Sequence, residues 1–88
     1  MRTLVEQAQA STVWTDEDNL WVALADGRHI AVPLRYFPRL LKATENQRKN
    51  YILSGGGTGI QWEDINEDIN VQGLLLGIGD RIKRSSYF

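Results

Sequence analysis

The sequence predicts an α+β domain, in which a small antiparallel sheet packs against two or three short helices. The sheet is expected to consist of a hairpin over residues 20–32 and flanking short strands. Two patterns carry this prediction: apolar residues alternate around an Asp-Gly turn, and they recur at helical spacing directly after Pro33. The 88 residues are 42% hydrophobic, which is enough for one core. We therefore expect a single domain over residues 1–79 and a basic, flexible tail over residues 80–88.

The hairpin has the sequence LWVALADGRHIAV and turns at Asp26-Gly27. A two-residue turn would divide its apolar side chains between both faces of the sheet. A three-residue loop, in which Gly27 follows a type I turn in the left-handed conformation, pairs residue 24 with 28, 22 with 30 and 20 with 32. This register places on the predicted core face Leu20, Val22, Leu24, Ile30 and Val32. The opposite face carries Trp21, Ala23, His29 and Ala31. A preceding strand over residues 10–15 is expected to reach the hairpin through a polar turn.

Two short helices are predicted after Pro33, which ends the hairpin because proline cannot donate a hydrogen bond to a sheet. Apolar residues at helical spacing follow, namely Leu34, Phe37, Leu40 and Leu41. Pro38 is tolerated only near a helix start, so we expect a turn over residues 34–37 and a helix that begins at Pro38. Thr44 and Gln47 have the spacing of a capping box, which predicts a second helix over residues 45–50.

The glycine-rich segment SGGGTGIQW, residues 54–62, lies between two strand-like runs. A phosphate-binding P-loop needs a Lys-Ser/Thr pair directly after its glycines, and a dinucleotide-binding loop opens a helix. Gly59 is followed instead by Ile60 and a predicted strand. We therefore interpret the segment as a structural turn that needs positive φ angles and close backbone approach. The turn glycines predicted for the whole chain are Gly27, Gly55, Gly56, Gly57 and Gly59.

A tandem repeat follows, because the tetrapeptide Glu-Asp-Ile-Asn occurs twice over residues 63–70. Its isoleucines, Ile65 and Ile69, are four residues apart, which predicts a helical turn that buries both and exposes the carboxylates. Asn70 is expected to cap a last short helix over residues 71–76, closed by Gly77.

No residues for catalysis, a cofactor or a metal ion are predicted. The chain has no cysteine, which excludes disulfides, thiolate metal sites and a cysteine nucleophile. His29 is the only histidine, and its predicted strand neighbours offer neither a nucleophile nor an orienting carboxylate. Residues 64–68 resemble the start of a calcium-binding loop, but Ile69 replaces the required glycine and Leu75 replaces the bidentate glutamate.

Charged residues form two patches although the net charge is only −1, from ten basic and eleven acidic residues. This balance argues against a general attraction to nucleic acid or to an anionic membrane. The basic stripe consists of Arg35, Arg39, Lys42, Arg48 and Lys49. The acidic patch consists of Glu63, Asp64, Glu67 and Asp68. These nine residues are the candidate interaction surface, and for the basic stripe a solvated face, a protein partner and nucleic acid stay open. The face that carries Trp21 becomes a further candidate interface if no other element covers it.

Four segments, in order, resemble one known family: DGRHIAVPLRYFPRLLKAT, QRKNY, GGGTGIQW and INEDINVQGLLLG. Their order and spacing are similar to those of the bacterial proteins known as domain of unknown function 2442, over about residues 12–77. Tyr36 and Tyr51 stand where tryptophan is common in that family, and Gln61 stands where histidine is common. The resemblance implies a compact α+β domain with no established activity, cofactor or catalytic residues. It also implies a gene neighbour that encodes another small protein, in an arrangement like a toxin–antitoxin pair.

We therefore expect a non-catalytic protein-interaction module, the antitoxin-like partner of a small neighbouring protein. The alternative is a nucleic-acid-binding accessory protein that acts through the basic face of residues 35–49. The first residues, MRTLVEQ, lack the apolar stretch of a signal peptide, so we expect a cytoplasmic protein with no membrane association. A monomer or a small homo-oligomer is expected.

Overall fold

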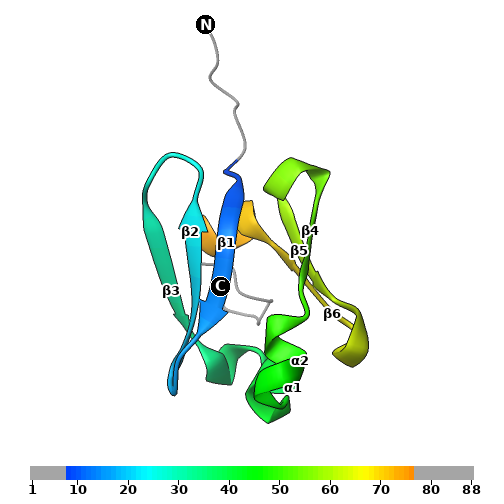
Figure 1. Ribbon diagram of the computed structural model, residues 1–88. Helices are drawn as coiled ribbons and strands as arrows, with labels where there is room; N and C mark the ends of the chain where they lie inside the picture. The colour runs from blue at the N-terminus through cyan, green and yellow to red at the C-terminus, as the bar shows by residue number, and fades with distance from the viewer. Residues whose placement is uncertain (1–7, 77–88) are drawn as a thin grey trace, which may run out of the picture.

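The computed structural model describes residues 8–76, in which six strands form two three-stranded antiparallel sheets (Figure 1). The first sheet consists of β1 (Ala10–Thr15), β2 (Asn19–Leu24) and β3 (His29–Pro33), in that order. The second consists of β4 (Ile52–Ser54), β5 (Gly59–Trp62) and β6 (Glu67–Asn70). The short helices are α1 (Pro38–Lys42), α2 (Glu45–Lys49) and α3 (Val71–Leu75). The predicted α+β class is confirmed, and the strands divide between two sheets where the sequence had suggested one.

The hairpin formed by β2 and β3 has the predicted register. Val22 lies opposite Ile30 and Leu20 lies opposite Val32, while the backbone N–H of Leu24 donates to the carbonyl of Arg28 over 2.7 Å. Gly27 has a φ of +98°, as the left-handed position of the loop requires. The side chains of β2 therefore alternate between the buried core and the outer face. The preceding strand is also confirmed, with a β-bulge between Ala10 and Thr12.

The helices after the first sheet begin where their capping residues predict. A 3₁₀ turn over Leu34–Tyr36 precedes α1, which begins at Pro38. The capping box of α2 is formed, because the Thr44 hydroxyl accepts a hydrogen bond from the backbone N–H of Gln47 and the Gln47 side chain accepts one from that of Thr44. None of the helices in the described part of the chain is long and apolar enough to cross a membrane.

The glycine segment forms the predicted turn between β4 and β5. Gly55, Gly56 and Gly57 all have positive φ angles, between +57° and +103°. A Cβ atom on Gly57 would lie 2.6 Å from the carbonyl oxygen of Ala10, so the turn packs tightly against the start of β1. Gly59 has no positive φ, and a Cβ atom there would lie 2.6 Å from the Ser54 hydroxyl. The glycines thus serve the backbone of the fold.

The helical turn predicted for the tandem repeat is wrong beyond its first half. Only Glu63–Ile65 forms a 3₁₀ turn, after which Asn66 adopts the left-handed conformation with a φ of 59°. Residues from Glu67 onward extend as β6, where Ile69 lies opposite Ile60 and is buried. Asparagine tolerates the left-handed region, and pairing with β5 satisfies backbone groups that a short helix would leave open.

The end of the described chain agrees with the predicted cap. The Asn70 side chain accepts a hydrogen bond from the backbone N–H of Gly73 over 2.8 Å, and α3 follows it. Gly77, predicted to close this helix, and the basic tail over residues 80–88 lie outside the described residues.

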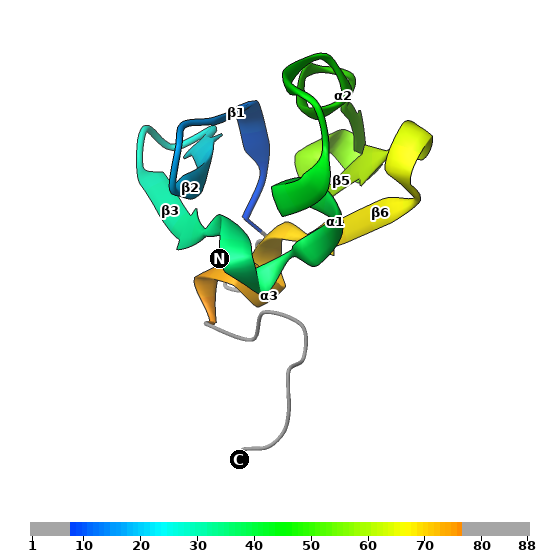
Figure 2. The same cartoon turned by 90° about the horizontal axis from the view of Figure 1, so that it is seen from below.

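The core lies between the two sheets, and Figure 2 shows α1 and α3 between them when the domain is seen from below. Trp62 is its largest fully buried side chain, and its indole N–H donates to the carbonyl of Arg48 over 3.0 Å. The hydroxyl of Tyr51 accepts a hydrogen bond from the backbone N–H of Val13, which joins the second half of the chain to the edge of β1. The buried residues are Ala10, Val13, Leu20, Val22, Leu24, Leu34, Phe37, Leu40, Ile60, Trp62, Ile69, Val71 and Leu74.

Candidate interaction surface

Two residues of the basic stripe donate hydrogen bonds to backbone carbonyls of the same chain. The Arg48 guanidinium donates to the carbonyl of Leu40 over 2.9 Å and to that of Leu41 over 3.0 Å, so it binds carbonyls at the end of α1. The Arg39 guanidinium donates to the carbonyl of Asn66. Both arginines therefore have structural partners that charge patterning in the sequence did not indicate.

The other three residues of the basic stripe are exposed, as is Arg39. Lys49 lies 3.9 Å from Glu45, one helical turn earlier, and the Arg35 guanidinium lies 5.5 Å from the centre of the Tyr36 ring. Lys42 is exposed at the end of α1. Exposed ion pairs of this kind contribute little free energy. Binding of a partner by this stripe stays a prediction.

The acidic patch lies beside Arg39, at the turn between β5 and β6. Glu63, Asp64 and Asp68 are exposed, while Glu67 is partly buried. Burial raises the pKa of the Glu67 carboxyl above its ordinary value, and the nearby positive charge of Arg39 acts in the opposite direction. The two patches that are separate in the sequence thus adjoin in the fold.

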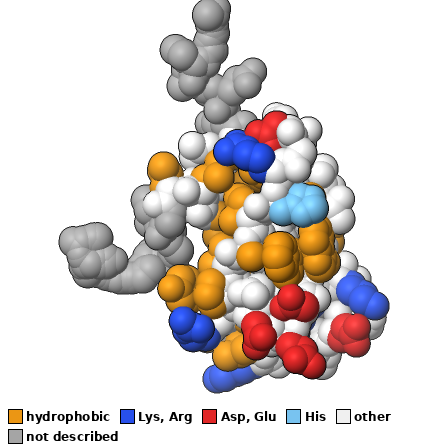
Figure 3. Space-filling view, turned by 90° about the vertical axis from the view of Figure 1, so that its left-hand side faces the viewer, with side chains coloured by type: hydrophobic (Ala, Val, Ile, Leu, Met, Phe, Trp, Pro, Cys, Tyr) orange, Lys and Arg blue, Asp and Glu red, His pale blue; other side chains and the backbone are white. Residues whose placement is uncertain are grey.

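The outer face of the first sheet carries aromatic side chains, of which Trp14 and His29 are exposed and Trp21 is partly buried; we call these three residues the tryptophan face. Trp14 and Trp21 lie opposite each other on β1 and β2, with parallel rings whose centres are 5.9 Å apart. The Trp14 ring also meets the His29 ring edge-on, at 5.6 Å between centres. Trp14 is 39% exposed and His29 is exposed, so no other element of residues 8–76 covers this face. Figure 3 shows the single histidine, in pale blue, beside hydrophobic side chains, with acidic side chains nearby.

An acidic turn over residues 16–18 borders the tryptophan face. Asp16 accepts a hydrogen bond from the Trp21 indole N–H over 2.8 Å, and its other oxygen accepts from the backbone N–H groups of Asp18 and Asn19. The bond from Trp21, followed by the backbone bonds, lowers the pKa of the Asp16 carboxyl. Asp16 is therefore ionised at neutral pH and fixes the orientation of Trp21. Sequence reasoning treated this segment only as a polar turn, although the acids adjoin Trp14 in the sequence.

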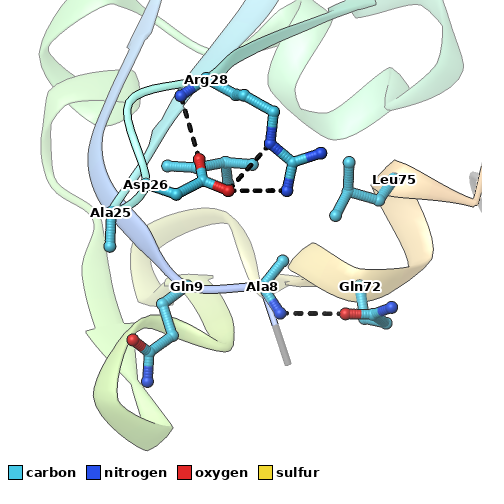
Figure 4. Close-up of a pocket in the computed structure, with 8 residues that line it drawn as sticks. Ala8, Gln9, Ala25, Asp26, Arg28, Gln72 and Leu75 are labelled. Carbon is cyan, nitrogen blue, oxygen red and sulfur yellow. Dashed lines mark hydrogen bonds and ion pairs between the residues drawn. The ribbon is translucent and has the colours of Figure 1, made fainter. Parts of the chain in front are cut away.

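A cavity of about 400 Å³ lies at the opposite end of the first sheet (Figure 4). It is lined by Ala8, Gln9, Leu24, Ala25, Asp26, Arg28, Gln72 and Leu75. Its charged groups satisfy each other, because the Arg28 guanidinium donates to Asp26 over 2.8 and 2.9 Å; this contact lowers the pKa of Asp26 and raises that of Arg28. The Gln72 side chain accepts a hydrogen bond from the backbone N–H of Ala8. These contacts present no activated nucleophile or base.

A smaller cleft of about 130 Å³ separates Trp14 from α2. It is lined by Val13, Trp14, Thr15, Glu45, Arg48, Lys49 and Tyr51. Trp14 therefore belongs to the tryptophan face and also lines this cleft. Within residues 8–76, no group of three or more His, Cys, Asp or Glu side chains is placed to hold a metal ion.

Two solved structures are similar to this fold. A protein of unknown function from Rhodospirillum rubrum is 26% identical, with a TM-score of 0.74 over 88% of this chain and 95% of that chain. An uncharacterised protein from Chromobacterium violaceum, known from solution NMR, is 25% identical, with a TM-score of 0.70 over 85% of this chain and 71% of that chain. No curated protein matches the chain.

The family resemblance predicted from the four sequence segments is confirmed. The model of the family described as "Protein of unknown function (DUF2442)" matches residues 10–80, which includes both sheets and all three helices. The chain therefore belongs to the DUF2442 family.

Proposed function

We propose that the protein is a non-catalytic interaction domain, which binds a small protein partner as in an antitoxin-like pair and does so through the tryptophan face. One observation carries the proposal: Trp14 and Trp21 form a stacked pair on the outside of the sheet, where Trp14 is 39% exposed. An exposed aromatic cluster costs solvation free energy in the isolated domain, and tryptophan is the residue type most enriched among binding hot spots. A partner that covered the pair would recover this free energy.

Contacts within the domain hold the side chains of the tryptophan face in place. Trp21 is held through its indole N–H by Asp16, and Trp14 is held by stacking on Trp21. Both rings project from paired strands, where the backbone is fixed by the sheet. Binding to such a surface requires little further ordering of side chains, which favours affinity.

The basic stripe is a weaker candidate for the binding surface than the tryptophan face. Arg39 and Arg48 donate to backbone carbonyls, so three of the five cations of the stripe have no such contact within residues 8–76, on a chain of net charge −1. Nucleic-acid affinity depends on many phosphate contacts, so this count disfavours the nucleic-acid alternative. A cytoplasmic location is part of the proposal, and the lack of cysteine fits a reducing compartment.

The experiment is co-expression with the small neighbouring gene product that the family resemblance implies, followed by size-exclusion chromatography and calorimetric titration. We expect a complex at micromolar concentrations that Trp14→Ala weakens by about 30-fold or more, as for a hot-spot residue of 2 kcal/mol. The control is Tyr36→Ala, which removes an aromatic ring that is 49% exposed on the 3₁₀ turn after β3.

A photo-crosslinking residue at position 23, on the outer face, extends the experiment to unknown partners in the cell. We expect one discrete adduct, absent when the same residue replaces Tyr36. The proposal is wrong if neither experiment yields a partner, or if Trp14→Ala and Tyr36→Ala weaken the complex equally.

A further inference from the structure

We infer that the tryptophan face and the acidic turn form one binding site, whose occupant is an extended segment of the partner protein that carries lysine or arginine. This inference rests on the proposed function and specifies the chemistry of the partner. Three features support it: the carboxylates of the acidic turn, the indole rings beside them and the open edge of β3.

The carboxylates and the indole rings are joined by a direct contact. The hydrogen bond of 2.8 Å from the Trp21 indole to Asp16 places a fixed negative charge at the edge of the stacked rings. A lysine or arginine side chain over an indole ring gains a cation–π interaction, and a carboxylate within reach adds a charge-assisted hydrogen bond. The apolar stem of either side chain also packs well on a tryptophan.

Within residues 8–76, no ion pair involves Asp16, Glu17 or Asp18. Asp16, Glu17 and Asp18 are all exposed. The ion pairs found within residues 8–76 join Arg28 to Asp26 and Lys49 to Glu45, away from the acidic turn. Lys49 and Arg48 line the cleft on the other side of Trp14, where Arg48 is already bound to backbone carbonyls. Charge complementarity therefore favours a basic occupant at the end of the face that borders the acidic turn.

The edge of β3 favours an extended occupant. Residues 24 and 28 form a hydrogen-bonded pair, and such pairs alternate along an antiparallel ladder, so the backbone groups of His29 and Ala31 point away from β2. No described strand pairs with that side of β3. The free edge of β1 differs, because its Val13 N–H is satisfied by the Tyr51 hydroxyl. A partner strand added to β3 would lie beside the small side chain of Ala31, opposite Trp21.

The experiment titrates the full chain with a short peptide of alternating threonine and lysine, and with a matched peptide of threonine and glutamate. NMR resonances of the three indole N–H groups report the site, with buried Trp62 as an internal control. We expect the lysine peptide to shift Trp14 and Trp21 but not Trp62, and to bind about tenfold or more tightly than the glutamate peptide.

Neutralising the turn tests the carboxylates directly. The double variant Glu17→Gln/Asp18→Asn is expected to weaken binding of the lysine peptide by about tenfold, because two carboxylates of the acidic turn are lost. Asp16 is kept because it holds Trp21. The matched control Glu63→Gln/Asp64→Asn removes two charges from the other acidic patch and is expected to change binding little. Equal weakening by both double variants would indicate non-specific attraction and would overturn the inference.

Failure of this inference is distinguishable from failure of the proposed function. If the partner complex forms and depends on Trp14 while the two peptides bind equally or not at all, the basic occupant is wrong and the interaction function stands. If the lysine peptide binds as expected but no partner complex forms, the site chemistry stands and the assigned partner is wrong. Self-association that Trp14→Ala abolishes, without peptide binding, would assign the face to a second copy and overturn the inference.

Discussion

The two sheets reach their structures in different ways. The first has strands of five and six residues with alternating apolar side chains, and its hairpin loop needs one positive φ angle, at Gly27. The second has strands of three and four residues, and its two turns contain four residues of positive φ. Its central tryptophan, Trp62, is fully buried against the rest of the domain. The first sheet is thus determined largely by local pattern, whereas the second depends on tertiary contacts, and only the first leaves aromatic rings on its outer face.

The largest expected effect comes from replacing Trp62, because this side chain is the largest fully buried one and joins the second sheet to the rest of the domain. Trp62→Ala removes a fully buried ring and its hydrogen bond to the Arg48 carbonyl, so we expect the free energy of unfolding to fall by about 3–5 kcal/mol. Urea unfolding followed by circular dichroism measures the loss. Because a small domain has little stability to lose, Trp62→Phe is a second variant, with an expected loss of about 1–2 kcal/mol. A loss from Trp62→Ala no larger than that from Trp14→Ala would contradict the comparison.

Glycine substitutions compare the turns of the two sheets. Gly57→Ala forces a side chain into a φ of +103° and places its Cβ 2.6 Å from the Ala10 carbonyl, so we expect a loss of about 2 kcal/mol or more. Gly27→Ala has a similar φ but open space around it, and about 1 kcal/mol is expected. Thermal unfolding of both variants measures the difference. Equal melting temperatures would mean that the contact between Gly57 and β1 adds no strain.

Gly59→Ala would place its Cβ close to the Ser54 hydroxyl, which can move. We therefore expect it to lower the free energy of unfolding by less than Gly57→Ala does.

The sequence was sufficient for the hairpin of β2 and β3, because a single register places Leu20, Val22, Leu24, Ile30 and Val32 on one face. It was insufficient for the tandem repeat, because Ile65 and Ile69 are four residues apart. This spacing places both side chains on one face of a helical turn, but it also places them on one face of a strand. In the fold, Asn66 adopts the left-handed conformation and the residues after it pair with the edge of β5 as strand β6. Pairing of this kind between strands in the fold produces no hydrophobic periodicity in the sequence by which it could be predicted.

The candidate site was predicted only in part, for a similar reason. Alternation placed Trp21 and His29 on one face, but the register of β1 was not predicted, so the stacking of Trp14 on Trp21 was not either. The basic stripe was grouped by charge alone. Which arginines point to backbone carbonyls depends on how α1, α2 and the β5–β6 turn pack, and side-chain type does not encode that packing.

Trp14→Ala tests the exposed tryptophan of the first sheet, in contrast to the buried Trp62 of the second. The ring is 39% exposed and its main contacts are stacking on Trp21 and an edge contact with His29, so we expect a loss of stability of about 1 kcal/mol. Urea unfolding measures this loss, and partner titration measures binding on the same sample. A stability loss comparable to that of Trp62→Ala would place Trp14 among the core residues and remove the argument that its exposure serves binding.

The smallest expected effects concern two carboxylates, one beside each sheet, whose pKa values shift in opposite directions. The pKa of Asp16 lies below its ordinary value of 3.8, so its ionised form stabilises the fold above that pH, and this contribution is lost as the pH falls through the lowered pKa. The pKa of Glu67 lies above its ordinary value of 4.5, because burial disfavours its charge, so its ionisation opposes folding at neutral pH and this cost is relieved as the pH falls through the raised pKa. We therefore expect Asp16→Asn to lower the melting temperature at pH 7 and Glu67→Gln to raise it. Both differences from the parent should shrink as the pH is lowered toward 3, where the carboxyls become protonated. Melting temperatures of the three proteins across this range test the signs, and a Glu67→Gln variant that is less stable at pH 7 would mean that attraction to Arg39 outweighs burial.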